Sequence, residues 1–129
     1  MNLMINIFKI GCQYLLGLIF LVFGLNGFIE FFPIQDGLNP KALTFITSLQ
    51  NIYLFKLIKS IEVICGILLL SGQFIPLALC CLAPIILNIF LFHFFLEPGE
   101  LLVAFVLLFL EIILILFNFK HFKSLLSRK

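Results

Sequence analysis

The feature that most constrains this chain is a succession of four long apolar segments separated by short polar breaks. The segments cover about residues 10–30, 52–70, 74–95 and 101–117. Each matches the length of helix that crosses a bilayer core of about 30 Å. Lipid offers no partners to backbone groups, so we expect each segment to be a helix. The sequence therefore predicts an all-α fold, an integral membrane four-helix bundle, as a single domain over residues 1–129.

The composition excludes several classes of protein. Hydrophobic residues make up 64% of the chain and charged residues 11%, and the mean hydropathy is +1.29. A soluble domain is roughly 45–50% apolar and about 25% charged. We therefore do not expect a water-soluble globule, a disordered chain, a nucleic-acid-binding protein or a multi-domain enzyme. The first apolar segment is too long for a signal peptide and lacks a cleavage site after it, so we expect it to be retained.

The distribution of basic residues indicates an orientation. Five of the eight Lys and Arg residues lie near the termini: Lys9, Lys120, Lys123, Arg128 and Lys129. Four spans place both ends of the chain on one side, and an excess of Lys and Arg marks the cytoplasmic side. We therefore expect both termini in the cytoplasm and a multi-pass protein of the cell (inner or cytoplasmic) membrane.

Two further segments are amphipathic. Asn39 and Pro40 are typical of a helix N-terminus, and apolar residues then recur at helical spacing at Ala42, Phe45, Ile46 and Leu49. This pattern predicts a short amphipathic helix in the first outer loop, either on the membrane surface, which we favour, or over the end of the bundle. The basic C-terminal tail is expected to lie on the inner leaflet and to attract anionic lipids, at about 1 kcal/mol per basic residue.

Eight polar residues lie within the apolar segments, and the orientation assigns each a depth. Glu111 falls near mid-depth, and seven others are expected between the outer face and the midplane: Asn26, Glu30, Lys56, Lys59, Glu62, Asn88 and His93. The repeat of three residues in the second segment places its charges on one helix face. A charge at the centre of a membrane helix costs about 2.5–3.5 kcal/mol, so this face is expected to point into the bundle.

These residues define a candidate binding site in the outer half of the bundle. We expect its lining to be formed by residues from three segments: Asn26, Lys59, Glu62, Asn88 and His93. Lys59 is expected to pair with Glu62, because the two are three residues apart on a helix. Two interpretations remain open. The group binds a ligand, an ion or a proton, or it consists of polar contacts that hold the helices together.

Three other charged residues are assigned as proton or charge partners of this site: Glu30, Lys56 and Glu111. Lys56 either joins the site or extends its ammonium group outward to the membrane surface. Glu111 either pairs with Lys59 across the bundle or stays protonated.

The glycines and cysteines have simpler interpretations. Gly17, Gly24 and Gly27 lie on or near one face of the first segment, which predicts close approach of another helix. The four cysteines are expected in the cytoplasmic half, with Cys65 at the height of Cys80 or Cys81. We favour packing as small apolar side chains over redox chemistry. The sequence contains no C-x-x-C or zinc-ligand spacing, so no metal site is expected.

Four stretches that together cover most of the chain form a distinctive set of motifs. They are LLGLIFLVFGLNGF over residues 15–28, Lys59-x-x-Glu62-x-x-x-Gly66, Phe74-x-Pro76-Leu77-Ala78-Leu79, and Ala83-Pro84-Ile85-x-x-Asn88-Ile89-x-x-Phe92-His93. In this set and in the four-helix layout, the chain resembles the DoxX family of small bacterial membrane proteins.

The resemblance implies a four-helix inner-membrane protein of bacteria. Some members of the family are subunits of membrane redox systems, including thiosulfate:quinone oxidoreductase, and others are linked to oxidative-stress complexes. Many have no assigned activity, so no catalytic residue is carried over to this chain and no stand-alone enzyme is implied.

The leading hypothesis is therefore an accessory subunit of a membrane redox system, or a protein that binds a small quinone-like ligand. A membrane partner subunit or a second copy of the chain is the implied partner. One alternative is a small proton-linked transporter that uses Lys59, Glu62 and Glu111. The other is a structural or assembly factor without a ligand.

Overall fold

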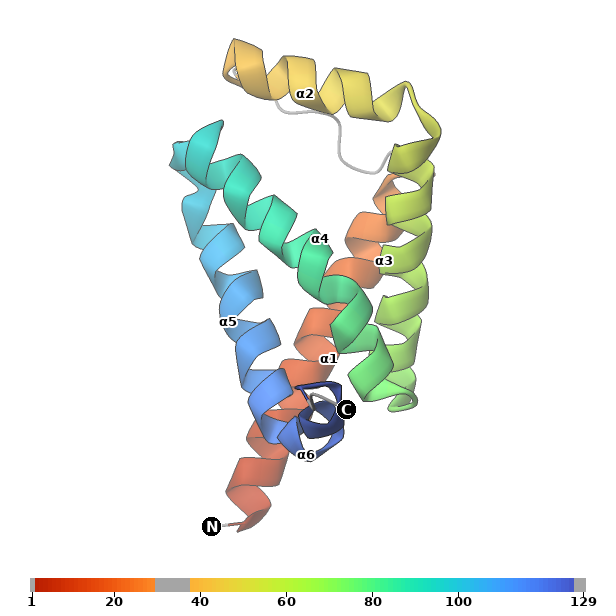
Figure 1. The fold of residues 1–129 in the computed structure, drawn as a ribbon, viewed down its shortest axis with the longest axis vertical. Helices are drawn as coiled ribbons and strands as arrows, with labels where there is room; N and C mark the ends of the chain where they lie inside the picture. The colour runs from red at the N-terminus through yellow and green to blue at the C-terminus, as the bar shows by residue number, and fades with distance from the viewer. Residues whose placement is uncertain (1, 30–37, 127–129) are drawn as a thin grey trace.

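The computed structural model describes residues 2–29 and 38–126, and this part of the chain is all-α (Figure 1). The helices are α1 (Asn2–Asn26), α2 (Pro40–Gln50), α3 (Tyr53–Ser71), α4 (Ile75–Phe95), α5 (Leu101–Phe117) and α6 (Phe119–Phe122). Two 3₁₀ turns, η1 (Pro98–Glu100) and η2 (Lys123–Leu126), complete the elements. The predicted all-α class is confirmed. Glu30, assigned above as a charge partner, lies outside the described residues, as do Arg128 and Lys129 of the basic tail.

The four predicted apolar segments correspond to α1, α3, α4 and α5, and only the first differs clearly in its bounds. The helix α1 already begins at Asn2, because residues 2–9 contain no helix-breaking residue and continue the helix beyond the apolar segment. It ends at Asn26, where the N–H of Gly27 donates to the carbonyl of Gly24 at 3.1 Å. Hydropathy marks where a chain becomes apolar, which is not where its helix must start.

By length and composition, two of the described helices can cross a membrane, namely α1 and α4. The helix α5 forms a third candidate together with the segment after it, which is bent away by 82°. The helix α3 is long enough at 19 residues, but it carries three charged side chains. These two or three candidate spans agree with the prediction of a membrane protein.

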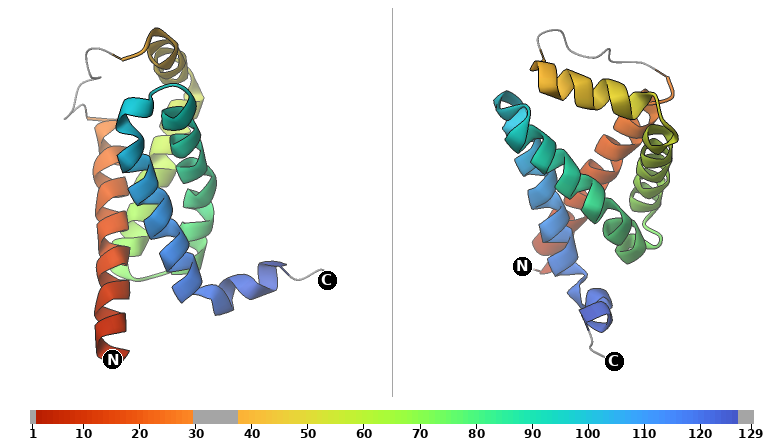
Figure 2. Two further views of the ribbon diagram at one scale, coloured as in Figure 1. Left: turned by 90° about the vertical axis from the view of Figure 1, so that its left-hand side faces the viewer. Right: turned by 45° about the horizontal axis from the view of Figure 1, so that its top comes forward.

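The long helices pack in pairs, with α1 along α3 and α4 along α5, and the pairs join through contacts between α3 and α4 and between α1 and α5. Figures 1 and 2 show α2 lying across one end of this assembly. The start of α1 and the short helix α6 lie at the opposite end. The part of the chain that carries Lys9, Lys120 and Lys123 is therefore far from α2.

Glycines allow α1 and α3 to approach closely. A Cβ atom at Gly17 would lie 2.9 Å from Cβ of Leu69, and one at Gly66 would lie 2.8 Å from the carbonyl oxygen of Gly17. A Cβ at Gly24 would lie 2.9 Å from the backbone nitrogen of Val63. These distances are too short for any larger residue, so the predicted close contact at the glycine face of α1 is confirmed.

The buried core lies in the part of the molecule away from α2. It combines residues from all four long helices: Leu16, Phe20, Cys65, Leu69, Ala78, Leu79, Leu82, Ile86, Leu107, Leu110 and Leu114. Gln13 adds a polar contact here, because its Nε2 donates to the carbonyl of Leu69 at 2.8 Å. This bond satisfies one of the carbonyl groups that the last turn of α3 leaves without a helical partner.

Candidate functional site

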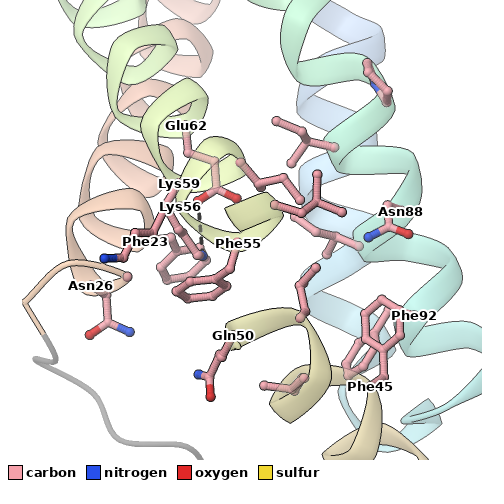
Figure 3. A pocket seen from close by; sticks show the side chains of 18 residues that line it. Phe23, Asn26, Phe45, Gln50, Phe55, Lys56, Lys59, Glu62, Asn88 and Phe92 are labelled. Atoms are coloured by element: carbon pink, nitrogen blue, oxygen red, sulfur yellow. Dashed lines mark hydrogen bonds and ion pairs between the residues drawn. The ribbon is translucent and has the colours of Figure 1, made fainter. Parts of the chain in front are cut away.

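Beyond the core, towards α2, the helices enclose a cleft of about 1120 Å³, which we call the cleft throughout (Figure 3). It is lined by the parts of α1, α3 and α4 nearest α2 and by one side of α2. Its polar lining consists of Asn26, Gln50, Lys56, Lys59, Glu62 and Asn88. The remaining lining is apolar and includes the rings of Phe23, Phe45, Phe55 and Phe92. A mainly apolar cleft with a few convergent polar groups is typical of a small-molecule site.

The structure brings together four of the five residues proposed from the sequence as a binding site. Asn26, Lys59, Glu62 and Asn88 line the cleft, and Figure 3 shows Asn88 on α4 opposite the charged face of α3. His93 is not among the lining residues. It follows Asn88 by five positions, which turns it by about 140° around the helix axis. Its Nδ1 lies 2.8 Å from the carbonyl oxygen of Ile89.

The ion pair at the centre of the cleft confirms the expected pairing on α3. Lys59 Nζ donates to Glu62 Oε2 at 3.2 Å, and the Glu62 side chain is only 4% exposed. The ammonium group also lies 5.5 Å from the centre of the Phe55 ring. The stem of Lys59 packs directly on Gly27, where any side chain would overlap it. The direction of the Lys59 side chain is thus fixed by its stem on Gly27 and by its ammonium group at Glu62 and Phe55.

Lys56 gives the cleft a positive charge. It lines the cleft one turn before Lys59 and is exposed. Among pairs of side chains that the structure describes, Lys59–Glu62 is the only ion pair. The described lining therefore carries two ammonium groups and one carboxylate, so hydrogen-bond donors predominate over acceptors.

The helix α2 covers the end of the bundle beside the cleft. Ala42 is fully buried, and the ring of Phe45 lies 5.4 Å from that of Phe92 on α4. The side chain of Asn39 accepts from the backbone N–H of Lys41 and caps the helix, as predicted. The placement favoured above, a surface anchor, is therefore corrected to a position over the bundle. The contact with Phe92 holds it there, and no local pattern reveals that contact.

A second polar position lies in the core, outside the cleft. Glu111 on α5 is 3% exposed, and neither of its carboxyl oxygens has a hydrogen-bond partner among the described residues. Of the two alternatives for Glu111, the pairing with Lys59 is not formed, because Lys59 binds Glu62 instead. The helix α5 contributes no residue to the cleft lining, and this separates Glu111 from the other charges.

The cysteines are free thiols, with Cys12 and Cys65 buried and Cys80 and Cys81 exposed. Cys65 and Cys81 are neighbours, which agrees with the expected similar height of these two residues. Within the described ranges, no three His, Cys, Asp or Glu side chains are placed to hold a metal ion.

Sequence reasoning missed the aromatic walls of the cleft. Phe55 precedes Lys59 by four residues, and Phe92 follows Asn88 by four. Residues four apart share a helix face, so the polar positions could have identified these rings as their neighbours. Gln50 and Phe45 on α2 carry no such signal, because their place in the site depends on where α2 docks.

Comparisons with known protein families, with curated proteins and with solved structures find no significant match to this chain. Its function is therefore argued from the cleft and its residues.

Proposed function

We propose that all four long helices cross the membrane, as in the DoxX family that the motifs resemble, and that both termini lie in the cytoplasm. The charged face of α3 supports this, because Lys59 and Glu62 point into the cleft and leave the other faces of α3 compatible with lipid. The position of Lys9, Lys120 and Lys123 at the end opposite α2 supports the orientation.

We further propose that the cleft binds the headgroup of a small amphipathic molecule, with a quinone as the best fit, and that the protein serves as an accessory subunit of a membrane redox system. The observation that carries this proposal is the pair of donors on opposite walls, Lys59 on α3 and Asn88 on α4. A quinone ring is flat and carries two carbonyl acceptors at opposite ends. The rings of Phe55 and Phe92 suit its apolar faces.

In such a subunit, the chemistry of electron transfer comes from the quinone, which takes up two electrons and two protons on reduction. The residues of this chain bind and orient the headgroup. Lys59 and Asn88 donate hydrogen bonds, and Glu62 holds the Lys59 ammonium in place at 3.2 Å.

The test is quinone binding to the purified protein in mild detergent. We expect mass spectrometry of the extracted lipids to detect a quinone, and an added quinone to raise the thermal unfolding temperature. Asn88→Leu should weaken binding about 5- to 10-fold, because a hydrogen bond contributes about 1 kcal/mol. The control Gln73→Leu removes an exposed amide outside the cleft and should have no effect.

A second pair of variants tests the charged wall. Lys59→Met combined with Glu62→Leu removes both charges together, so no unpaired buried charge is left behind. Binding should weaken at least tenfold, whereas Lys41→Met, on the exposed side of α2, should leave binding unchanged. Absence of a bound quinone, together with no stabilisation by added quinone, would reject the proposal. Loss of a partner's abundance alone would indicate an assembly factor.

Glu111 favours a second candidate, a small proton-linked transporter. Burying a carboxyl group without a described partner costs folding free energy, and the Glu111 side chain is only 3% exposed in a core of leucines. Such a group is suited to binding and releasing a proton during transport. Proteoliposomes should then show a flux driven by a pH gradient that Glu111→Gln abolishes. A flux that is unchanged in this variant excludes the candidate.

A further inference from the structure

The α3 and α4 helices are in contact at one end and separated by the cleft at the other. Near the core, Cys65 and Leu69 of α3 belong to the same buried cluster as Ala78 and Leu82 of α4. Nearer α2, residues of both helices line the cleft instead of contacting each other, among them Ile58 and Ile89. Figures 1 and 3 show this divergence.

The cleft remains open along the edges of these two helices. Leu54 on α3 lines the cleft and is still 37% exposed. Asn88 on α4 also lines the cleft and is exposed. Their neighbours on the outer faces, Leu57 and Leu87, are 50% and 52% exposed. In a spanning bundle the leucines of this edge face lipid, where exposed apolar side chains carry no penalty.

The end of the cleft near α2 is covered. The helix α2 contacts the beginning of α3, which follows it in the chain, and extends to the end of α4. There the N–H of Asn39, the cap of α2, donates to Oε2 of Glu97, just after α4, at 3.0 Å. The Phe45–Phe92 contact lies on the same side. The hydrogen bond between Asn39 and Glu97 and the Phe45–Phe92 contact thus hold α2 against the end of α4.

The polarity of the lining changes along the cleft. Lys59, Glu62 and Asn88 lie deeper in the cleft, whereas α2 and the first turn of α3 add the apolar side chains Ile46, Leu49 and Leu54. A ligand with one polar end and one apolar end therefore fits with its polar end between Lys59 and Asn88 and its apolar end towards Leu54. Since donors predominate, that polar end must carry acceptors.

We propose that the cleft takes a membrane-dissolved amphiphile with an acceptor headgroup and a long apolar chain, which enters from the bilayer between α3 and α4 while α2 stays in place. This inference rests on the proposed function. It adds the route by which the ligand enters and the requirement that the ligand carry a long apolar tail. The headgroup lies between Lys59 and Asn88, and the chain leaves the cleft past Leu54.

The experiment fixes α2 to α4 and compares two quinones in liposomes, one with a long isoprenoid chain and one short and water-soluble. Asn39→Cys and Glu97→Cys, both outside the cleft lining, are introduced in a chain whose four native cysteines are replaced by Ala, and a short bifunctional thiol reagent joins them. The backbone nitrogen of Asn39 lies 3.0 Å from Glu97 Oε2, so thiols at these two positions are within reach of such a reagent. The same variant without the reagent is the control.

We expect the cross-link to change the uptake rate of the long-chain quinone by less than twofold. The long-chain compound should also bind at least tenfold more tightly than the short one, because buried methylene groups add affinity. Slowing of long-chain uptake by tenfold or more, or equal affinity for both compounds, overturns the inference. If neither compound binds the protein without the cross-link, the proposed function itself fails and the inference with it.

A second variant pair tests the route directly. Leu54→Trp places a large ring at the edge of the cleft and should slow uptake of the long-chain quinone at least fivefold. Leu57→Trp, on the same helix but outside the lining, should not slow it. Equal rates for the two variants would rule out this edge as the route.

Discussion

The two ends of this molecule are built from the same helices but packed in opposite ways. At the packed end, α1 and α3 touch through Gly17 and Gly66, and leucines fill the space between the long helices. At the cleft end, α3 and α4 stand apart around a space of about 1120 Å³. The cleft end contains Lys59, Glu62 and Asn88, whereas Gln13 and Glu111 are buried at the packed end.

The difference shows how side-chain size controls the spacing of helices. Gly66 and Ala78 let the backbones approach at the packed end, where both are buried. Phe55, Pro84 and Phe92 hold the lining apart at the cleft end. Small residues at helix contacts allow the close packing that drives association in lipid, where the hydrophobic effect gives little. Close packing at one end can therefore stabilise a bundle whose helices stand apart at the other end.

The largest expected effect comes from filling the packed end. Gly17→Val should destabilise the protein by about 2–3 kcal/mol, because its Cβ meets Leu69 in a tightly packed core. Gly11→Val is the matched control on the same helix, since a Cβ there meets nothing within 4 Å. Thermal unfolding in detergent measures both variants. Equal unfolding temperatures would mean that the glycine contact does not hold the packed end together.

A stabilising change is expected at Glu111. Glu111→Leu should stabilise the protein by about 1–2 kcal/mol, because it removes a buried polar group without a described partner. Glu111→Gln keeps a polar group in the same place and should give no such gain. Unfolding titrated with a denaturing detergent measures both. A loss of stability in Glu111→Leu would reveal a bound partner for the carboxyl group.

The smallest effect is expected in α2, at the cleft end. Asn39→Ala removes the cap on the N–H of Lys41 and should cost this helix about 1 kcal/mol. Hydrogen exchange of the α2 amides should rise about fivefold, while the global unfolding temperature stays unchanged. Ser48→Ala, an exposed change in the same helix, is the control. Unfolding of the whole protein in Asn39→Ala would show that the packed end depends on α2.

The sequence predicted the helices well and the site in part. The bounds of α3, α4 and α5 follow from hydropathy and from the glycine and proline residues at the breaks. The Lys59–Glu62 pair follows from helical spacing, because both partners lie on one helix. His93 was assigned to the site from its depth alone, and its direction around α4 separates it from the cleft.

The sequence by itself determined which segments are helical and which face of each helix is polar, because helical periodicity relates residues only three or four positions apart. Tertiary structure decided that α3 and α4 diverge, that α2 covers the cleft, and that Lys59 binds Glu62 while Glu111 has no described partner. These outcomes depend on the sizes of side chains that meet from distant segments, such as Phe45 and Phe92. No pattern within one helix carries that information.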